Sequence, residues 1–518
     1  MTPEQELIEL VSDWRNHVDQ LPIWSAGEER LHALMSAVLG GKIAVAERGV
    51  DFPEFSWEVL LDYLLSWHFR HPFGDEPCTE EGVHDAVFAA MQAMRFESLS
   101  AALQIGAYRV RKTGNNFRVT YKWDMGLEVA DLYLERQAAP VGLEGPTEKE
   151  MEWASGQSRA GLNPFDPPGD VIRATFERTR RSVQAWRDAS QESPLSDSID
   201  LGDGLTVGVM ANVLAALMAV AELGEMAHSK GRVRGTTLQH ATEEAIVESV
   251  GRLCDDLSQE VVLQAIRRLM AGPGKSMRTS LLIPNSGLIT ILPLVMFPRA
   301  IDAIVLRTAA ADRARYGPIG QRLGERAVAW GRWLTDIPGA MIAESVGVRD
   351  PGRRIAGDLD VVAVDPSSRK GLVLEVKWPI DAVTLRENSK TDELIIRASV
   401  QLGRVRGLLR AGVAHVKFPD GWPDFNDIDW SWGIGAPQQL TSQPLPESDM
   451  FATSFRYVSR LGQTASLSDL IAILENPIVP ELNKHYRVGA KTLSLGRHFV
   501  LIEVLECKVA DWKPNIGS

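Results

Sequence analysis

Cysteine is scarce in this sequence, with only Cys78, Cys254 and Cys507 among 518 residues. The three are far apart and odd in number, which argues against a disulfide framework and favours a reducing compartment. The first 20 residues are rich in charge and lack the apolar core and small-residue cleavage site of a secretory signal. We therefore expect a cytoplasmic protein.

Long hydrophobic runs are also lacking. The longest spans residues 205–221, contains Asn212 and has no basic flanks. This run is short for a membrane span, which needs about 20 predominantly apolar residues. It predicts a buried helix, and we expect no membrane partner.

Positive charge is low overall, because the chain carries a formal net charge of −13. The distribution is uneven: residues 307–410 contain 18 Lys and Arg against 13 Asp and Glu, a local net charge of +5. A basic segment in an acidic protein indicates one confined nucleic-acid site. It argues against nucleic-acid binding over the whole protein surface.

The length predicts several domains, and the pattern predicts a multidomain α+β and α/β protein with a helical N-terminal half. The expected divisions are a mostly helical domain over 1–138 with a β-hairpin near 107–123, a Pro- and Gly-rich linker over 139–170, a helical domain over 171–306, a mixed αβ core over 307–420 and an extension over 421–518.

The predicted hairpin near 107–123 consists of two runs in which apolar and basic residues alternate, separated by a turn at Gly114. One face carries Tyr108, Val110, Phe117, Val119 and Tyr121, and the other carries Arg109, Arg111, Arg118 and Lys122. The basic face either lies along a phosphate backbone or is a solvated surface.

The stretch from Gly357 to Trp378 carries most of the functional signal. Two β-branched, apolar runs flank a Pro-Ser-Ser turn, which predicts a hairpin. Period-two alternation places Asp358 with Asp360 on one face of the first strand and Glu375 with Lys377 on one face of the second. Carboxylates gathered in a cleft are costly unless a cation neutralises them, and Mg²⁺ prefers such oxygen ligands.

The spacing D-(x14)-E-x-K formed by Asp360, Glu375 and Lys377 resembles the PD-(D/E)XK, or restriction-endonuclease-like, nuclease superfamily. The spelling GDLD is similar to the G-(D/E)-x-D form of the Asp motif, although Leu359 replaces the proline of the literal motif. The resemblance implies that Asp360, Glu375 and the Val376 carbonyl bind Mg²⁺ or Mn²⁺. It also implies that Lys377 is the catalytic lysine.

The order of predicted elements is also similar to the αβββαβ core of that superfamily. A helix over 319–334 and a strand over 340–347 precede the motif strands at 358–365 and 371–378. A helix over 389–411 and a short strand over 414–418 follow. The spacing of the motif residues and the order of the predicted elements therefore agree on a core over residues 317–420.

The resemblance suggests further site residues on the two helices. Glu325 in the first helix matches an additional acid near the metal, and Gln401 in the second matches a catalytic glutamine of some members. The alternative for Glu325 is a surface salt bridge.

Basic residues beside Gln401 are candidates for phosphate contacts. On the second helix, Lys390, Arg397 and Arg404 fall on the same edge as Gln401. The loop before the Asp motif adds Arg349, Arg353 and Arg354. The alternative for the helix edge is a row of solvated arginines on an ordinary amphipathic helix.

The expected function is therefore a metal-dependent deoxyribonuclease in bacterial restriction, repair or phage defence. DNA is the expected partner, with a protein partner or homo-oligomer besides, and the N-terminal half would recognise one of them. The alternatives are a catalytically silent nuclease-fold protein that binds nucleic acid or regulates, and an RNase on the same scaffold.

Two weaker signals are set aside. His68, His71, Cys78 and His84 match no familiar zinc spacing. The GPGKS at 272–276 lacks the first glycine of a phosphate-binding loop, because Leu269 occupies that position.

Overall fold

Contacts divide the chain into two compact units. The sheet-rich unit comprises Met1–Leu10, Ser98–Ala139 and Gly320–Ser518, and the helical unit comprises Val11–Glu97 and Pro140–Ile319. The computed structural model describes the whole chain except residues 48–56, 105, 124, 138–143, 158–166, 191–194, 231–238, 274, 276–279, 292–300, 311–318, 321–327, 353, 379–384, 438–444, 448, 462–463, 510–511 and 515–518.

A six-stranded mixed sheet forms the centre of the sheet-rich unit, in the order β11-β8-β9-β10-β12-β13. Its strands are β8 (Met341–Arg349), β9 (Ile355–Asp365), β10 (Lys370–Val376), β11 (His415–Val416), β12 (Asp429–Ala436) and β13 (Met450–Ser454). The strands β8, β9 and β10 form an antiparallel meander, whereas β12 runs parallel to β10 and β13 parallel to β12.

The predicted division at residue 420 falls inside this sheet and is wrong. The short strand expected over 414–418 is β11, which joins the opposite edge of the sheet beside β8. The chain returns to β10 only with β12, after α14 (Leu385–Arg410) has crossed the sheet. Trp430 and Trp432 belong to this strand, and the acids around them concealed its apolar pattern.

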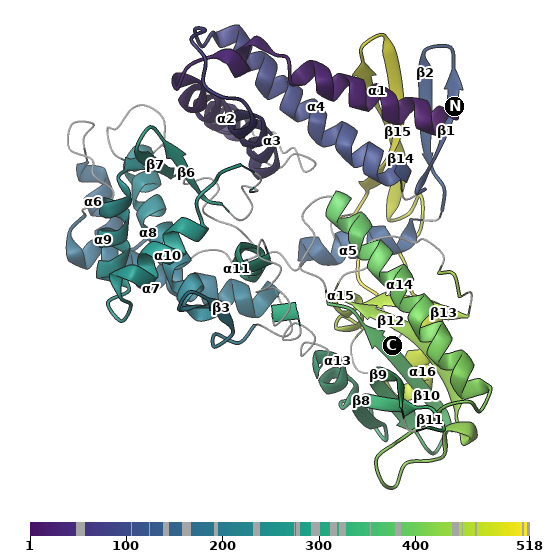
Figure 1. Ribbon diagram of the computed structural model, residues 1–518. Helices are drawn as coiled ribbons and strands as arrows, with labels where there is room; N and C mark the ends of the chain where they lie inside the picture. Colours follow the sequence, from purple (N-terminus) through teal and green to yellow (C-terminus); the bar gives the residue numbers. More distant parts are fainter. Residues whose placement is uncertain are drawn as a thin grey trace. The chain divides into compact units, whose positions relative to one another are not determined.

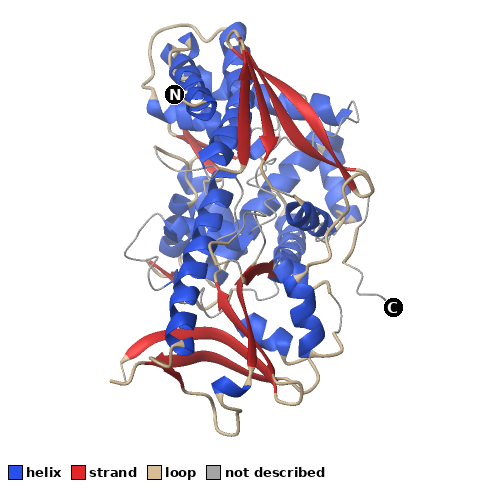
Figure 2. Cartoon of the chain, turned by 90° about the vertical axis from the view of Figure 1, so that its right-hand side faces the viewer, coloured by secondary structure: helices blue, strands red, loops and turns tan. Residues whose placement is uncertain are grey.

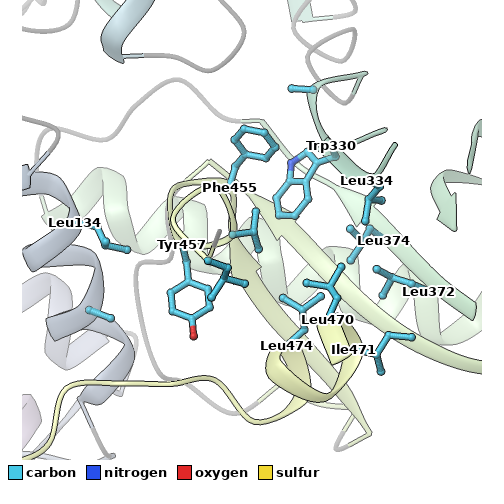
Figure 3. Packing of buried hydrophobic residues seen from close by; sticks show 14 of the residues in the cluster. Leu134, Trp330, Leu334, Leu372, Leu374, Phe455, Tyr457, Leu470, Ile471 and Leu474 are labelled. Carbon is cyan, nitrogen blue, oxygen red and sulfur yellow. The ribbon is translucent and has the colours of Figure 1, made fainter. Parts of the chain in front are cut away.

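Helices cover both faces of the six-stranded sheet. Figure 1 shows α14 lying across one face, where Ile395, Ala398 and Leu402 pack against Val362 and Val373. The other face is covered by α5 (Gly126–Gln137), α13 (Val328–Leu334), α15 (Phe455–Val458) and α16 (Leu467–Glu475). Figure 3 shows Trp330, Phe455 and the leucines of α16 gathered around Leu372 and Leu374 of β10.

A second, four-stranded sheet in this unit has the order β1-β2-β15-β14. Its strands are β1 (Tyr108–Thr113), β2 (Asn116–Tyr121), β14 (Tyr486–Leu495) and β15 (His498–Cys507), and the strands of both sheets are red in Figure 2. The predicted hairpin near 107–123 is confirmed, but β15 of the expected C-terminal extension pairs with it in parallel. The tail therefore completes a sheet begun almost 400 residues earlier.

The helical unit is built around α8 (Val207–Lys230), whose residues from Val213 to Ala221 are fully buried. By length and composition α8 is the one described helix that would suffice to cross a membrane. Its burial confirms the expected core helix. The other helices are η1 (Pro22–Ser25), α2 (Glu29–Glu47), α3 (Trp57–Arg70), α6 (Glu148–Gly156), α7 (Gly169–Ser190), α9 (Glu243–Leu253), α10 (Gln259–Arg268) and α11 (Ile301–Ala310), with α1 (Pro3–Val18) and α4 (Glu80–Gln104) divided between the units.

Two expectations for residues 139–306 need correction. The predicted linker contains α6, which begins with a capping box in which Thr147 and Glu150 bind each other's backbone N–H. The expected all-helical domain also contains a hairpin of β3 (Asp200–Gly202) and β4 (Leu205–Thr206) and a sheet of β5 (Gln239–Ala241), β7 (Leu288–Ile291) and β6 (Leu282–Asn285).

Buried ion pairs join the elements of the helical unit. The Arg187 side chain of α7 is 2% exposed, and its Nε donates to Asp302 Oδ1 of α11 at 2.7 Å. Asp302 Oδ2 also accepts the Leu195 N–H at 3.2 Å. Arg187 also pairs with the exposed Asp197 at 2.7 Å, so removing Asp302 leaves the buried guanidinium with only this solvated acidic partner.

We predict that Asp302→Ala lowers the free energy of unfolding of the helical unit by about 1–3 kcal/mol, because the Leu195 N–H and Arg187 Nε lose their acceptor while Asp197 still pairs with Arg187. Denaturant titration followed by circular dichroism measures this loss. Arg181→Ala is the control, because the pair of Arg181 with Glu144 is more than half exposed on both sides and contributes little. Equal stability of the two variants would contradict the assigned role of Asp302.

Candidate active site

The strands β9 and β10 diverge at the predicted metal-binding residues. Their ladder ends with the pair Leu374–Val361, one position before Glu375 and Asp360 would face each other. There Asp360 Oδ2 accepts the Val376 N–H at 2.7 Å. On its other side β10 continues along β12, and the Lys377 N–H donates to the Gly435 carbonyl at 2.8 Å. A side-chain carboxylate thus takes the place of a backbone partner at the point of divergence.

Glu375 and Lys377 form an ion pair beside Asp360. Lys377 Nζ lies 2.5 Å from Glu375 Oε1. The Glu375 side chain is 4% exposed and that of Lys377 is 25% exposed. Solvent therefore reaches the ion pair from the Lys377 side, while Glu375 is enclosed by the protein.

The electrostatics of these residues disfavour the bare carboxylates. Burial raises the pKa of Glu375, and the charge of Asp360 raises it further, while Lys377 opposes both effects. Burial also raises the pKa of Asp360, against the Val376 N–H and Lys377. The exposed Asp358 adds a smaller repulsion to both. We call Asp358, Asp360 and Glu375 the acidic cluster.

A divalent cation fits the donor set of Asp360 and Glu375. Two neighbouring carboxylates with raised pKa values offer hard oxygen ligands, and a cation would relieve their repulsion. Among the described residues no group of three or more His, Cys, Asp and Glu has metal-binding geometry. Asp360 and Glu375 would supply two carboxylates, a number typical of Mg²⁺ that also binds water and phosphate.

Packing beneath the cluster fixes the path of β10 and β12. Trp330 of α13 lies so close to Gly435 that a Cβ there would stand 2.9 Å from its ring. Phe455 contacts Trp330 and Trp378 with ring centroids 5.0 and 5.8 Å away. Because Gly435 binds the Lys377 backbone, this aromatic packing helps to hold Lys377 in place.

Sequence reasoning missed Ser345, which has a φ of 52° within β8. It lies between the ladder pairs Glu344–Val361 and Val346–Leu359, and so across from Asp360. A left-handed conformation is uncommon for a residue other than glycine and costs about 1–3 kcal/mol. The polar Glu344-Ser345 step in an otherwise apolar strand was the available signal.

The predicted residues of α14 lie on its exposed side. Lys390, Gln401 and Arg404 are exposed, and Arg397 pairs with Glu393 at 3.2 Å. Within the described part of the chain no hydrogen bond joins Gln401 to the acidic cluster. Its catalytic role therefore stays a prediction.

The loop between β8 and β9 presents Arg349 and Arg354, which are both exposed. Asp350 closes the loop, because its N–H donates to the Arg354 carbonyl at 3.0 Å and its Oδ1 accepts the Arg354 N–H at 2.8 Å. Glu325 and Arg353 lie outside the described residues.

We predict a response of thermal stability to pH and to Mg²⁺ that depends on Glu375. A carboxyl group with a raised folded-state pKa stabilises the fold below its unfolded-state pKa, and this contribution is lost as the pH rises through the folded-state pKa. Without metal, the melting temperature should therefore fall as the pH rises above the ordinary glutamate value of 4.5. Mg²⁺ at ten times its Kd should restore about 1.4 kcal/mol at neutral pH.

Differential scanning calorimetry with EDTA or Mg²⁺ measures both effects. Glu375→Gln should melt higher than the wild type in EDTA at neutral pH and lose most of the Mg²⁺ response. The control Glu393→Gln, at an exposed position on α14, should keep that response. A Glu375→Gln variant that retains the full response would rule out a cation at this position.

No family model, curated protein or solved structure matched this chain. The function is therefore inferred from the residues of the site.

Proposed function

We propose that this chain is a metal-dependent nuclease that hydrolyses phosphodiester bonds of DNA, with Mg²⁺ or Mn²⁺ as cofactor. The observation that carries the proposal is the meeting of Asp360, Glu375 and Lys377 where β9 and β10 diverge. Three residues matched by spacing in the sequence thus meet at one place in the fold.

The chain path around the cluster supports the proposal. The elements α13, β8, β9, β10, α14 and β12 follow one another in the αβββαβ order that the resemblance implies, apart from the short β11. The strands β8, β9, β10 and β12 are neighbours in that order, with an antiparallel meander and one parallel crossover. We infer a restriction-endonuclease-like core from this arrangement.

The residues divide the chemistry among them. Asp360 is oriented by the Val376 N–H, and Asp360 and Glu375 would hold the cation, with the Val376 carbonyl as a further ligand. The cation supplies Lewis-acid charge and lowers the pKa of a bound water. Lys377 places a positive charge beside the phosphate, whose oxygens gain negative charge as the water attacks and the leaving oxygen departs.

DNA is favoured over RNA because the sequence carries no recognisable motif of a single-stranded RNA-binding module. Restriction, repair or phage defence in the bacterial cytoplasm are the settings that the resemblance suggests. The helical unit would recognise the substrate or a partner. A catalytically silent binding or regulatory protein is the second candidate, and the cleavage assay separates the two.

Cleavage should depend on Mg²⁺ or Mn²⁺ and on Lys377. Linear duplex, plasmid, single-stranded DNA and RNA incubated with Mg²⁺, Mn²⁺ or EDTA identify the substrate. On that substrate, Lys377→Ala should reduce the cleavage rate by about 10²–10³-fold and leave binding largely intact, because the charge acts on the transition state.

Lys370→Ala provides the matched control for that loss. Lys370 begins the same strand and pairs with the exposed Asp429 at 2.5 Å, far from the divergence. Its replacement should leave the rate unchanged. No metal-dependent cleavage by the wild type, or full activity of Lys377→Ala, would favour the silent binding protein.

The basic residues of α14 and of the β8–β9 loop should carry phosphate contacts. Each lost contact on duplex DNA should reduce the magnitude of the slope of log affinity against log salt by about 0.9. Replacing Arg349 and Arg354 with Ala should therefore weaken binding to all sequences alike and reduce the slope by about 1.8, as should Lys390→Ala with Arg404→Ala. Unchanged slopes in fluorescence-anisotropy titrations would place the duplex elsewhere.

A further inference from the structure

Near the β1–β2 turn the four-stranded sheet β1-β2-β15-β14 has one buried and one exposed face, whereas at its other end Tyr486 and Leu505 pack into the core. Val110, Phe117, Val119 and Val500 on the inner face are at most 7% exposed. The register places the row Arg111, Arg118, Leu501 and Thr492 on the outer face, directly beside the row Thr113, Asn116, Phe499 and Ser494.

Three arginines gather on the outer face without acidic partners. Arg111 and Arg118 stand directly opposite each other in the β1–β2 ladder, and Arg109 follows two positions along β1. Like charges in directly opposed positions destabilise a sheet. Within the described parts of the chain none of the three forms an ion pair, and the nearby Glu503 instead accepts the Tyr121 N–H at 2.9 Å. An anionic ligand would relieve this repulsion.

Large apolar side chains lie exposed beside these arginines. Phe499 is 52% exposed, Leu501 38% and Val488 40%, on adjacent strands of the same face. A hollow of about 180 Å³ lies at Leu501 and Val488, lined also by Arg118, Glu503 and the small residues Gly489 and Ala490. Pockets for drug-sized ligands measure about 300–1,000 Å³, so this hollow suits a single flat ring.

We propose that the outer face of this sheet binds single-stranded nucleic acid. Arg109, Arg111 and Arg118 would contact phosphates, while an unpaired base stacks on Phe499 and a neighbouring base enters the hollow at Leu501. Aromatic residues on a sheet flanked by cations provide this combination of stacking and charge, which a paired duplex cannot use because its bases are enclosed. A purely apolar protein partner would leave the opposed arginines uncompensated.

This binding face goes beyond the proposed nuclease activity but belongs to the same compact unit. Tyr133 Oη of α5 donates to the His485 carbonyl just before β14, at 2.7 Å. Leu505 of β15 and Tyr486 of β14 pack into the hydrophobic core that contains Leu372 and Leu374 of β10. A strand held on this face would therefore be tethered to the unit that carries the acidic cluster.

Fluorescence anisotropy with the full chain in EDTA tests the proposal without any cleavage. The probes are labelled 20-nucleotide oligo(dT), oligo(U) and a 20-base-pair duplex, and comparison of the first two distinguishes DNA from RNA. Phe499→Ala should weaken binding of the preferred single strand by roughly 5- to 150-fold and leave duplex binding unchanged. Phe499→Tyr keeps an aromatic face and should bind nearly as tightly as the wild type.

The arginines are tested by the double substitution Arg111→Ala and Arg118→Ala. Loss of two phosphate contacts should reduce the single-strand salt slope by about 1.4. Arg332→Ala with Arg460→Ala removes the same charge from exposed positions of the same unit and should leave the slope unchanged.

Three results would overturn the proposal: no single-strand binding by the wild type, an unchanged affinity of Phe499→Ala, or equal losses for single strand and duplex. The Mg²⁺-dependent cleavage assay is scored separately. Cleavage by a wild-type protein that does not bind single strands would refute the inference alone, and binding without cleavage would refute the nuclease alone.

Discussion

The hydrogen bond from the Val376 N–H to Asp360 is the interaction on which the site depends. Adjacent antiparallel strands normally satisfy each other's backbone groups, and leaving one unpaired is costly. Here the ladder ends early and the carboxylate of Asp360 satisfies the freed N–H. The separation of β9 from β10 opens space for a ligand, and the Val376 N–H is not left without an acceptor there. The same hydrogen bond orients the Asp360 carboxylate that would hold the cation.

The buried carboxylates and the strained backbone lower the stability of the fold, and packing in the surrounding hydrophobic core offsets this loss. The acidic cluster places neighbouring carboxylates where burial raises the pKa values of two of them, and Ser345 adds backbone strain across the sheet. The hydrophobic layers on both faces hold the strands in register, with Trp330 packed against Gly435 and α14 packed against Val362 and Val373. Costly groups of this kind persist at functional sites because the rest of the fold over-determines them.

Local patterns predicted the elements better than the way these elements assemble. Alternating runs located β9, β10 and the β1–β2 hairpin, because each strand presents one buried face. Pairing partners far apart in sequence leave no local trace, so the return of β12 to β10 and of β15 to β2 was not foreseen. The capping box of Thr147 and Glu150 was visible, but the surrounding prolines and glycines suggested a linker. Asp360, Glu375 and Lys377 were found by their spacing, whereas the strain at Ser345 arises from tertiary structure.

The parallel pairing of β15 with β2 also determines when the sheet-rich unit is complete during synthesis. Ribosomes add about 5–20 residues per second, so β2 emerges tens of seconds before its neighbour on that scale. Closing so long a connection is entropically unfavourable and slow. Until then the edge of β2 and the apolar side chains of its inner face lack their partner, and such edges invite association with other chains. We therefore infer that truncation before β15 lowers solubility and also removes Leu505 from the core that contains Leu372 and Leu374, although the strands of the six-stranded sheet end at residue 454.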